Sequence, residues 1–259
     1  MRNIISSLVV VFMIVVGAMI LLPCIKAVRL AAKKSICGSN LRQIGLTVQN
    51  FETLSPGKFP QAARPNPNLA PKSRLSWLYE ITPFIQATNV FERMDRERGW
   101  EADENRYLAV YEFPRLYRCP AFEDRVPQNT LIPTSYIGIA GVGRDAADLP
   151  LGDPNAGFFG YDRRFSHEGI EGRAGSILMA IETSQTEGAW TAAGPATVRG
   201  LDTEGPTYVG LNGQFGGMHT GGAIAVFADA SVHHQSASID RHVLEAMARL
   251  TDKSNKGRE

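Results

Sequence analysis

The sequence predicts an α+β protein in which a long N-terminal helix packs on a mainly antiparallel β head domain. Three observations predict this fold: an uncharged apolar run near the start, a helical apolar pattern that continues to about residue 54, and glycine-bounded apolar segments in the second half. The predicted divisions are a transmembrane anchor at 1–25, an amphipathic continuation of the helix at 26–54, a globular head at 55–250 and a disordered tail at 251–259.

The anchor is predicted from the run Asn3–Ile25, which contains no charged residue. At ~1.5 Å per residue it spans ~35 Å, enough to cross a hydrocarbon core of ~30 Å. The alternative is a cleaved secretory signal, whose apolar region is usually only about 7 to 15 residues long and ends at a small-residue site. No such site follows this run, so we expect a retained, single-pass anchor.

The helix is predicted to continue past the anchor, because apolar residues recur at spacings of three, four and seven, as on one face of an amphipathic helix. These residues are Leu30, Cys37, Leu41, Ile44, Val48 and Phe51. The stretch "SPGKFP" at 55–60 is expected to end the helix, and Pro23 is expected to kink it.

The rest of the chain predicts short strands and helical turns. "TSYIGIAG" at 134–141, "SILMAIE" at 176–182 and "AIAVFA" at 223–228 are predicted strands, and 76–94 reads as helical turns interrupted by proline. A last helix is predicted after Asp240 as N-cap. Its apolar face would consist of Val243, Leu244, Met247 and Leu250.

Composition excludes some functions. The formal net charge of +1 leaves no basic face, so we expect no nucleic-acid partner. The three cysteines show no CxxC or Cys/His spacing of a zinc site, and no dinucleotide or nucleophile motif stands in a suitable context. We therefore expect no metal, no cofactor and no catalytic residue.

The basic residues beside the anchor complicate its orientation. Lys26, Arg29, Lys33 and Lys34 lie on the head side, and a positive-inside count would leave the head in the cytoplasm. Long domains translocate largely regardless of such charges, so both orientations stay open at this point.

Several stretches, in order, resemble one family. They are "CGSNLRQIGLTVQNFE" at 37–52, "GKFP" at 57–60, "SWLYEITPFIQ" at 76–86, "RCPA" at 118–121, "TSYIGIAG" and the terminal "FGGMHTGG…FADASVHHQSASID". The chain resembles the DUF1559 proteins, which are abundant in planctomycetes and carry a pilin-type N-terminal helix and an H-X9-DG motif. In this sequence the motif falls on His219, Asp229 and Ala230, the last in place of glycine.

The resemblance implies a type IV pilin or pseudopilin-like architecture without an established biochemical activity. It also implies a location in the cell inner membrane with an extracytoplasmic head, and other pilin-like subunits as partners. A pilin-type start would have a leader and a glutamate. Here only Met1 stands where the leader should be and Ser6 where the glutamate should be, so we expect an uncleaved chain.

His219 and Asp229 are not expected to act together, because the strand between them, about six residues at ~3.3 Å each, holds them ~20 Å apart. Asp229 is instead expected to start a hairpin turn by accepting backbone hydrogen bonds. In a two-residue turn Ala230 would need a positive φ, which costs alanine roughly 1 kcal/mol. His219 is expected to satisfy loop carbonyls or a carboxylate.

Two further groups of residues were weighed for binding. Glu168, Glu171 and Glu182 could line a Ca²⁺ site, but scattered surface acids are the preferred interpretation. Trp77, Trp100 and Trp190 are expected to anchor the core rather than to stack on sugars.

A disulfide between Cys37 and Cys119 is predicted if the head lies in an oxidising compartment. Cys37 belongs to the apolar helix face, and Cys119 lies in the apolar segment "LYRCPAF". The alternative is two separate buried thiols.

The expected function is a structural or assembly role at the cell envelope without catalysis. The alternative is a surface module that binds a solute or glycan, with exposed tryptophans around a pocket. A metal-dependent enzyme is the third hypothesis, and it would require a cleft with converging titratable groups.

Overall fold

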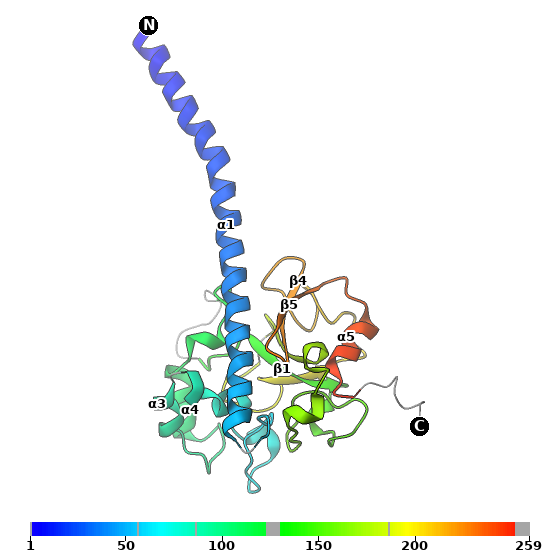
Figure 1. The fold of residues 1–259 in the computed structure, drawn as a ribbon. Coiled ribbons are helices and arrows are strands. Elements are labelled where there is room, and N and C mark those ends of the chain that lie inside the picture. Colours follow the sequence, from blue (N-terminus) through cyan, green and yellow to red (C-terminus); the bar gives the residue numbers. More distant parts are fainter. Residues whose placement is uncertain (1, 56, 86, 123–129, 186, 252–259) are drawn as a thin grey trace.

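The computed structural model describes residues 2–55, 57–85, 87–122, 130–185 and 187–251, without the side chains of residues 2–6 and 9. A long helix, α1 (Arg2–Leu54), projects from a head that contains all other elements (Figure 1). The expectations about Met1, the side chain of Ser6 and the tail at 252–259 concern parts outside this description.

Helix α1 runs without a break through Pro23. It ends directly before "SPGKFP", as the sequence predicts. Its C-terminal half lies along the head, and its N-terminal half extends away from it (Figure 1). Within the described residues one helix is long and apolar enough to cross a membrane, Val10–Leu54, with a mean hydropathy of 2.5 in its most apolar window.

The predicted apolar face of α1 is confirmed over its C-terminal half only. Cys37, Leu41, Ile44 and Val48 are 0% exposed, because the head packs on this face. Leu30 was wrongly included, since it is 61% exposed. It lies in the part of α1 that extends beyond the head.

The head is built on one mixed sheet of five strands in the order β3-β1-β2-β4-β5. The strands are β1 (Tyr136–Val142), β2 (Leu178–Glu182), β3 (Val198–Leu201), β4 (Gly222–Phe227) and β5 (Val232–Ser236). Strand β3 pairs with β1 in parallel and the other three pairings are antiparallel. The sequence analysis missed β3, which has only four residues and includes an arginine.

Helices cover both faces of the sheet, so β1, β2 and β4 are buried along their whole length. Alternate residues point to opposite sides. Tyr136 and Ala140 of β1 belong to the core that contains the apolar face of α1, whereas Ile137 and Ile139 belong to the core under α5 (Arg241–Ala248).

The remaining helices are short: α2 (Trp77–Glu80), α3 (Thr88–Arg93) and α4 (Asp103–Tyr111). The predicted interruption of the 76–94 region is confirmed, while α4 was not predicted. Asp240 caps α5 by accepting hydrogen bonds from the amides of His242 and Val243. The helix α5 buries Leu244, as predicted, together with Ala248. Val243 was wrongly included in its apolar face, since it is 46% exposed.

The hairpin between β4 and β5 contains the last residues of the H-X9-DG motif. Asp229 Oδ1 accepts a hydrogen bond of 2.8 Å from the amide of Ser231, as expected for a turn residue. The loop has three residues rather than two, because Phe227 is hydrogen-bonded both to the amide of Ala230 and to the carbonyl of Ser231. Ala230 has the predicted positive φ, at 62°.

The hairpin packs closely on α1. A Cβ added at Gly45 would lie 2.8 Å from Val226 Cγ2 and 3.0 Å from Ala230 Cβ. The methyl group of Ala230 is therefore part of this contact, and the residue is only 4% exposed. Since removing that methyl loses buried apolar surface, Ala230→Gly alone is expected to be nearly neutral instead of stabilising by about 1 kcal/mol.

Gly45→Ala is expected to lower the free energy of unfolding by about 1 to 2 kcal/mol, because the overpacking cost exceeds the gain in helix propensity. Ala230→Gly should recover part of the loss in that background. Denaturant titration of both single variants and the double variant measures the coupling. Gly38→Ala is the matched control, since its Cβ would lie 3.8 Å from Val232 and should stabilise the helix. Equal effects at both glycines would contradict the close contact.

Candidate functional site

Four chemically reactive side chains from four separate segments meet under α1. They are Cys37 on α1, Cys119 after the short 3-10 helix Arg115–Tyr117, Glu182 at the end of β2 and His219 before β4. We call these four residues the Cys-Glu-His cluster. One ligand atom from each lies within 4.8 Å of the others, and among the described residues no other such group was found.

Cys37 and Cys119 are joined by a disulfide with Cα atoms 5.2 Å apart. Both residues are 0% exposed. The bond closes a loop of 82 residues and ties the long helix to the head. Cys24 is a free, exposed cysteine.

Glu182 is the least expected member of the cluster. The sequence analysis grouped it with surface acids, but its side chain is 0% exposed, because it ends a strand that is covered on both faces. Neither carboxylate oxygen has a hydrogen-bond partner among the described residues. Burial raises the pKa of Glu182 to about 8, although the nearby Ile224 amide and Lys34 lower it.

His219 lies between the disulfide and the glutamate. Its Nε2 is 3.4 Å from Cys119 Sγ and 3.6 Å from Glu182 Oε2. Its side chain is 5% exposed, and burial together with the charge of Lys34 lowers its pKa. Of the two expected kinds of partner for His219, loop carbonyls or a carboxylate, a carboxylate lies beside it, at a distance longer than a hydrogen bond.

His219 and Asp229 lie at opposite ends of β4. His219 forms a bridge with Gly222 at the start of the strand, and Asp229 lies in the hairpin after Phe227. The six residues of β4, at ~3.3 Å each, put roughly 20 Å between the two ends of the strand. The two ends of the H-X9-DG motif therefore lie in different parts of the fold, His219 in the Cys-Glu-His cluster and Asp229 in the hairpin turn.

The other candidate residues are dispersed. Glu168 and Glu171 are exposed, and neither belongs to a metal-like group with Glu182 among the described residues. Trp77 and Trp190 are 0% exposed, as predicted for core anchors. Trp100 is half-buried, and its Nε1 donates a 3.0 Å hydrogen bond to the carbonyl of Lys72.

A polar pocket of about 330 Å³ opens beside β3. Its lining includes Arg144, Asp145, Asp148, Arg199 and Asp202, and none of the three tryptophans. Arg144 already pairs with Asp202 at 2.9 Å, and Arg199 donates to the carbonyls of Pro195 and Gln185. Arg144, Arg199 and Asp202 of this lining therefore have partners within the protein.

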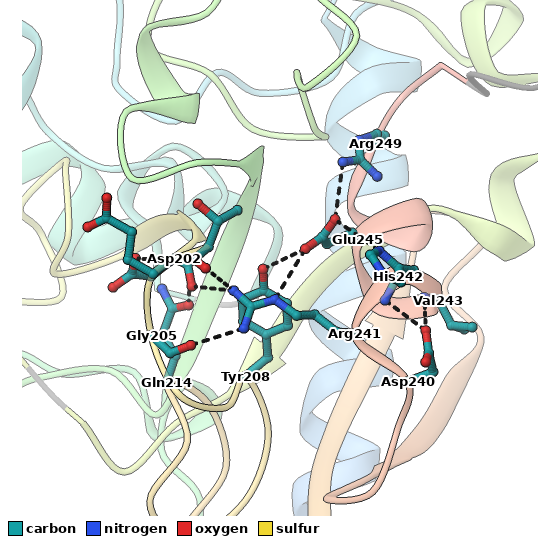
Figure 2. A network of polar contacts seen from close by, with 12 residues as sticks. Asp202, Gly205, Tyr208, Gln214, Asp240, Arg241, His242, Val243, Glu245 and Arg249 are labelled. Carbon is teal, nitrogen blue, oxygen red and sulfur yellow. Dashed lines mark hydrogen bonds and ion pairs between the residues drawn. The ribbon is translucent and has the colours of Figure 1, made fainter.

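A network of polar contacts holds α5 against the loop after β3 (Figure 2). Arg241 donates to backbone carbonyls of residues 202, 203 and 205, and its guanidinium lies 4.5 Å from the Tyr208 ring centroid. Glu245 accepts from the Tyr208 hydroxyl at 2.8 Å and from Arg249 at 3.3 Å. Each charge in the network has an internal partner, which indicates a structural role.

The Cys-Glu-His cluster could not be read from local spacing, because its members are separated by 37 to 82 positions in the chain. One signal was available. Glu182 ends the otherwise apolar strand "SILMAIE", and a charged residue inside a buried sheet needs a nearby partner.

One comparison with known proteins identifies a family. Residues 26–179 match the model of the SBP_bac_10 family, described as protein of unknown function (DUF1559). That segment includes both disulfide cysteines but neither Glu182 nor His219. No curated protein and no solved structure matches the chain. Because the match covers more than half of the sequence, the chain belongs to the DUF1559 family.

Proposed function

We propose that this protein is a membrane-anchored, pilin-like component of the cell envelope with a structural or assembly role. The observation that carries the proposal is one continuous helix with two different environments. One face of its C-terminal half is buried against the head, whereas apolar residues of its N-terminal half are exposed. Such a large apolar surface is stable only in lipid or against other apolar helices.

The head is placed outside the cytoplasm in this proposal, with the anchor in the inner membrane. The Cys37–Cys119 disulfide supports that placement, because such bonds persist in oxidising compartments. It outweighs the basic residues that follow the anchor, since the positive-inside rule weakens for a long translocated domain.

In this proposal the protein is not an enzyme. The titratable groups that converge, Glu182 and His219, are 0% and 5% exposed and are closed off from substrate. The burial of Trp77 and Trp190 also argues against a tryptophan-lined glycan site. The partners that fit are the membrane and other pilin-like subunits.

The full-length protein should stay in the membrane fraction after a carbonate wash, because the apolar helix is held in lipid. The head should be cut by external protease in spheroplasts and spared in inverted vesicles. Recovery in the soluble fraction, or the opposite protection pattern, would contradict the proposed topology.

Subunit contact through the anchor is tested with Cys24, which is exposed on α1. Mild oxidation of native membranes should cross-link copies of the chain, or the chain to a subunit identified by mass spectrometry. Cys24→Ser is the matched control and should abolish the cross-link. A chain that stays uncross-linked while other membrane thiols react would count against an assembly role through this face.

A further inference from the structure

We propose that the Cys-Glu-His cluster becomes a binding site for a thiophilic divalent metal ion, with Zn²⁺ the best fit, when the Cys37–Cys119 disulfide is reduced. The ligands would be the two thiolates, the imidazole of His219 and the carboxylate of Glu182. The inference does not rest on the proposed structural role, because it follows from the four side chains alone.

The geometry suits a tetrahedral ion. Zn²⁺ binds sulfur at about 2.3 Å and nitrogen or oxygen at about 2.0 to 2.2 Å, which puts neighbouring ligand atoms about 3.3 to 3.8 Å apart. The Nε2 of His219 is 3.4 Å from Cys119 Sγ and 3.6 Å from Glu182 Oε2. The other ligand atoms lie within 4.8 Å of one another, and the two bonded sulfurs, whose Cα atoms are 5.2 Å apart, must separate.

The unsatisfied carboxylate is an independent indication. Both oxygens of Glu182 are buried without a hydrogen-bond partner among the described residues, and the side chain is 0% exposed. Buried carboxylates normally coordinate a metal ion or pair with another group. Among the described residues, the Glu182 carboxylate has the Ile224 amide nearby and His219 Nε2 at 3.6 Å, and it lies where a fourth ligand is needed.

The charge balance also fits. Two thiolates, one carboxylate and Zn²⁺ carry a net charge of −1. Lys34 is close enough to act electrostatically on both Glu182 and His219. The lysine can therefore compensate the remaining charge from outside the ligand set.

The redox step balances with a dithiol reductant. Two electrons from the dithiol break the Cys37–Cys119 bond, the two protein thiols form, and the reductant becomes a disulfide. Metal binding then releases to solvent the two thiol protons and, where Glu182 is protonated, its carboxyl proton as well. The disulfide-bonded and metal-bound states exclude each other, since both use the same sulfurs.

The test uses the full-length chain in detergent with Cys24→Ser, so that only the two clustered cysteines remain. The protein is unfolded with a phosphine reductant and refolded with Co²⁺ as probe. We expect one Co²⁺ per chain, the intense visible bands of a tetrahedral ion and a thiolate-to-cobalt charge-transfer band. Zn²⁺ should remove these bands and raise the melting temperature of the reduced chain.

Variants distinguish a metal site with four protein ligands from metal binding by the two thiols alone. Glu182→Gln and His219→Asn should each weaken Co²⁺ binding by at least tenfold, while the exposed-residue controls Glu168→Gln and His167→Asn should not. The oxidised chain should show no charge-transfer band. Absence of the band in the reduced chain, failure of metal to restore a folded state, or unchanged affinity in the two ligand variants would each overturn the proposal.

Discussion

Replacing both Cys37 and Cys119 with alanine is expected to lower the free energy of unfolding by about 4 kcal/mol. In the chain-entropy model, a disulfide across 82 residues stabilises the folded state by about 4.5 kcal/mol, and strain or residual unfolded structure reduces that figure. The bond stabilises the fold because it holds residues 37 and 119 together in the unfolded chain, which lowers the entropy of that chain.

The measurement is a denaturant titration of the full chain in detergent, with a metal chelator present to keep the Cys-Glu-His cluster free of ions. Cys24→Ala is the control, since this cysteine is exposed and forms no disulfide. Its midpoint should match that of the unmodified protein. A loss below about 1 kcal/mol in the double variant would mean that packing of α1 alone holds the helix on the head.

Glu182→Gln is expected to stabilise the disulfide-bonded protein by about 5 kcal/mol above pH 8 and to have little effect at pH 4. The folded-state pKa of Glu182 is raised from 4.5 to about 8 by burial. Below pH 4.5 the carboxyl is protonated in both states, so Glu182 itself costs no stability there. As the pH rises from 4.5 to about 8, the unfolded chain ionises first, so stability falls.

The amide cannot ionise, so the variant should lack this loss. Each pKa unit corresponds to about 1.4 kcal/mol, so the rise from 4.5 to about 8 gives an effect of about 5 kcal/mol. His219, with its lowered pKa, acts in the other direction and destabilises the fold as pH falls below 6.5. That slope should remain in both proteins and cancel in their difference.

The experiment compares unfolding midpoints of the native and Glu182→Gln proteins from pH 4 to pH 9. Glu168→Gln serves as control, because that carboxylate is exposed and its replacement should leave the pH profile unchanged. A stability difference that does not vary with pH would show that folding does not raise the pKa of Glu182.

The sequence by itself was sufficient to predict the elements whose pattern is local. The uncharged run Asn3–Ile25, the apolar spacing from Cys37 to Phe51 and the cap at Asp240 each predict a helix from neighbouring residues, and the structure has helices there. The positive φ of Ala230 was also predictable, because a tight hairpin leaves few backbone conformations to its last residue.

Only the tertiary structure decided which residues of these elements are buried and which meet. Leu30 and Val243 fit the apolar pattern but are exposed, because no other element packs on them. Glu182 has the composition of a surface residue, yet helices on both faces of the sheet bury it. Its position beside His219 and the disulfide depends on four segments that are distant in the chain. Local sequence patterns extend over a few residues, and burial depends on the packing of the whole head.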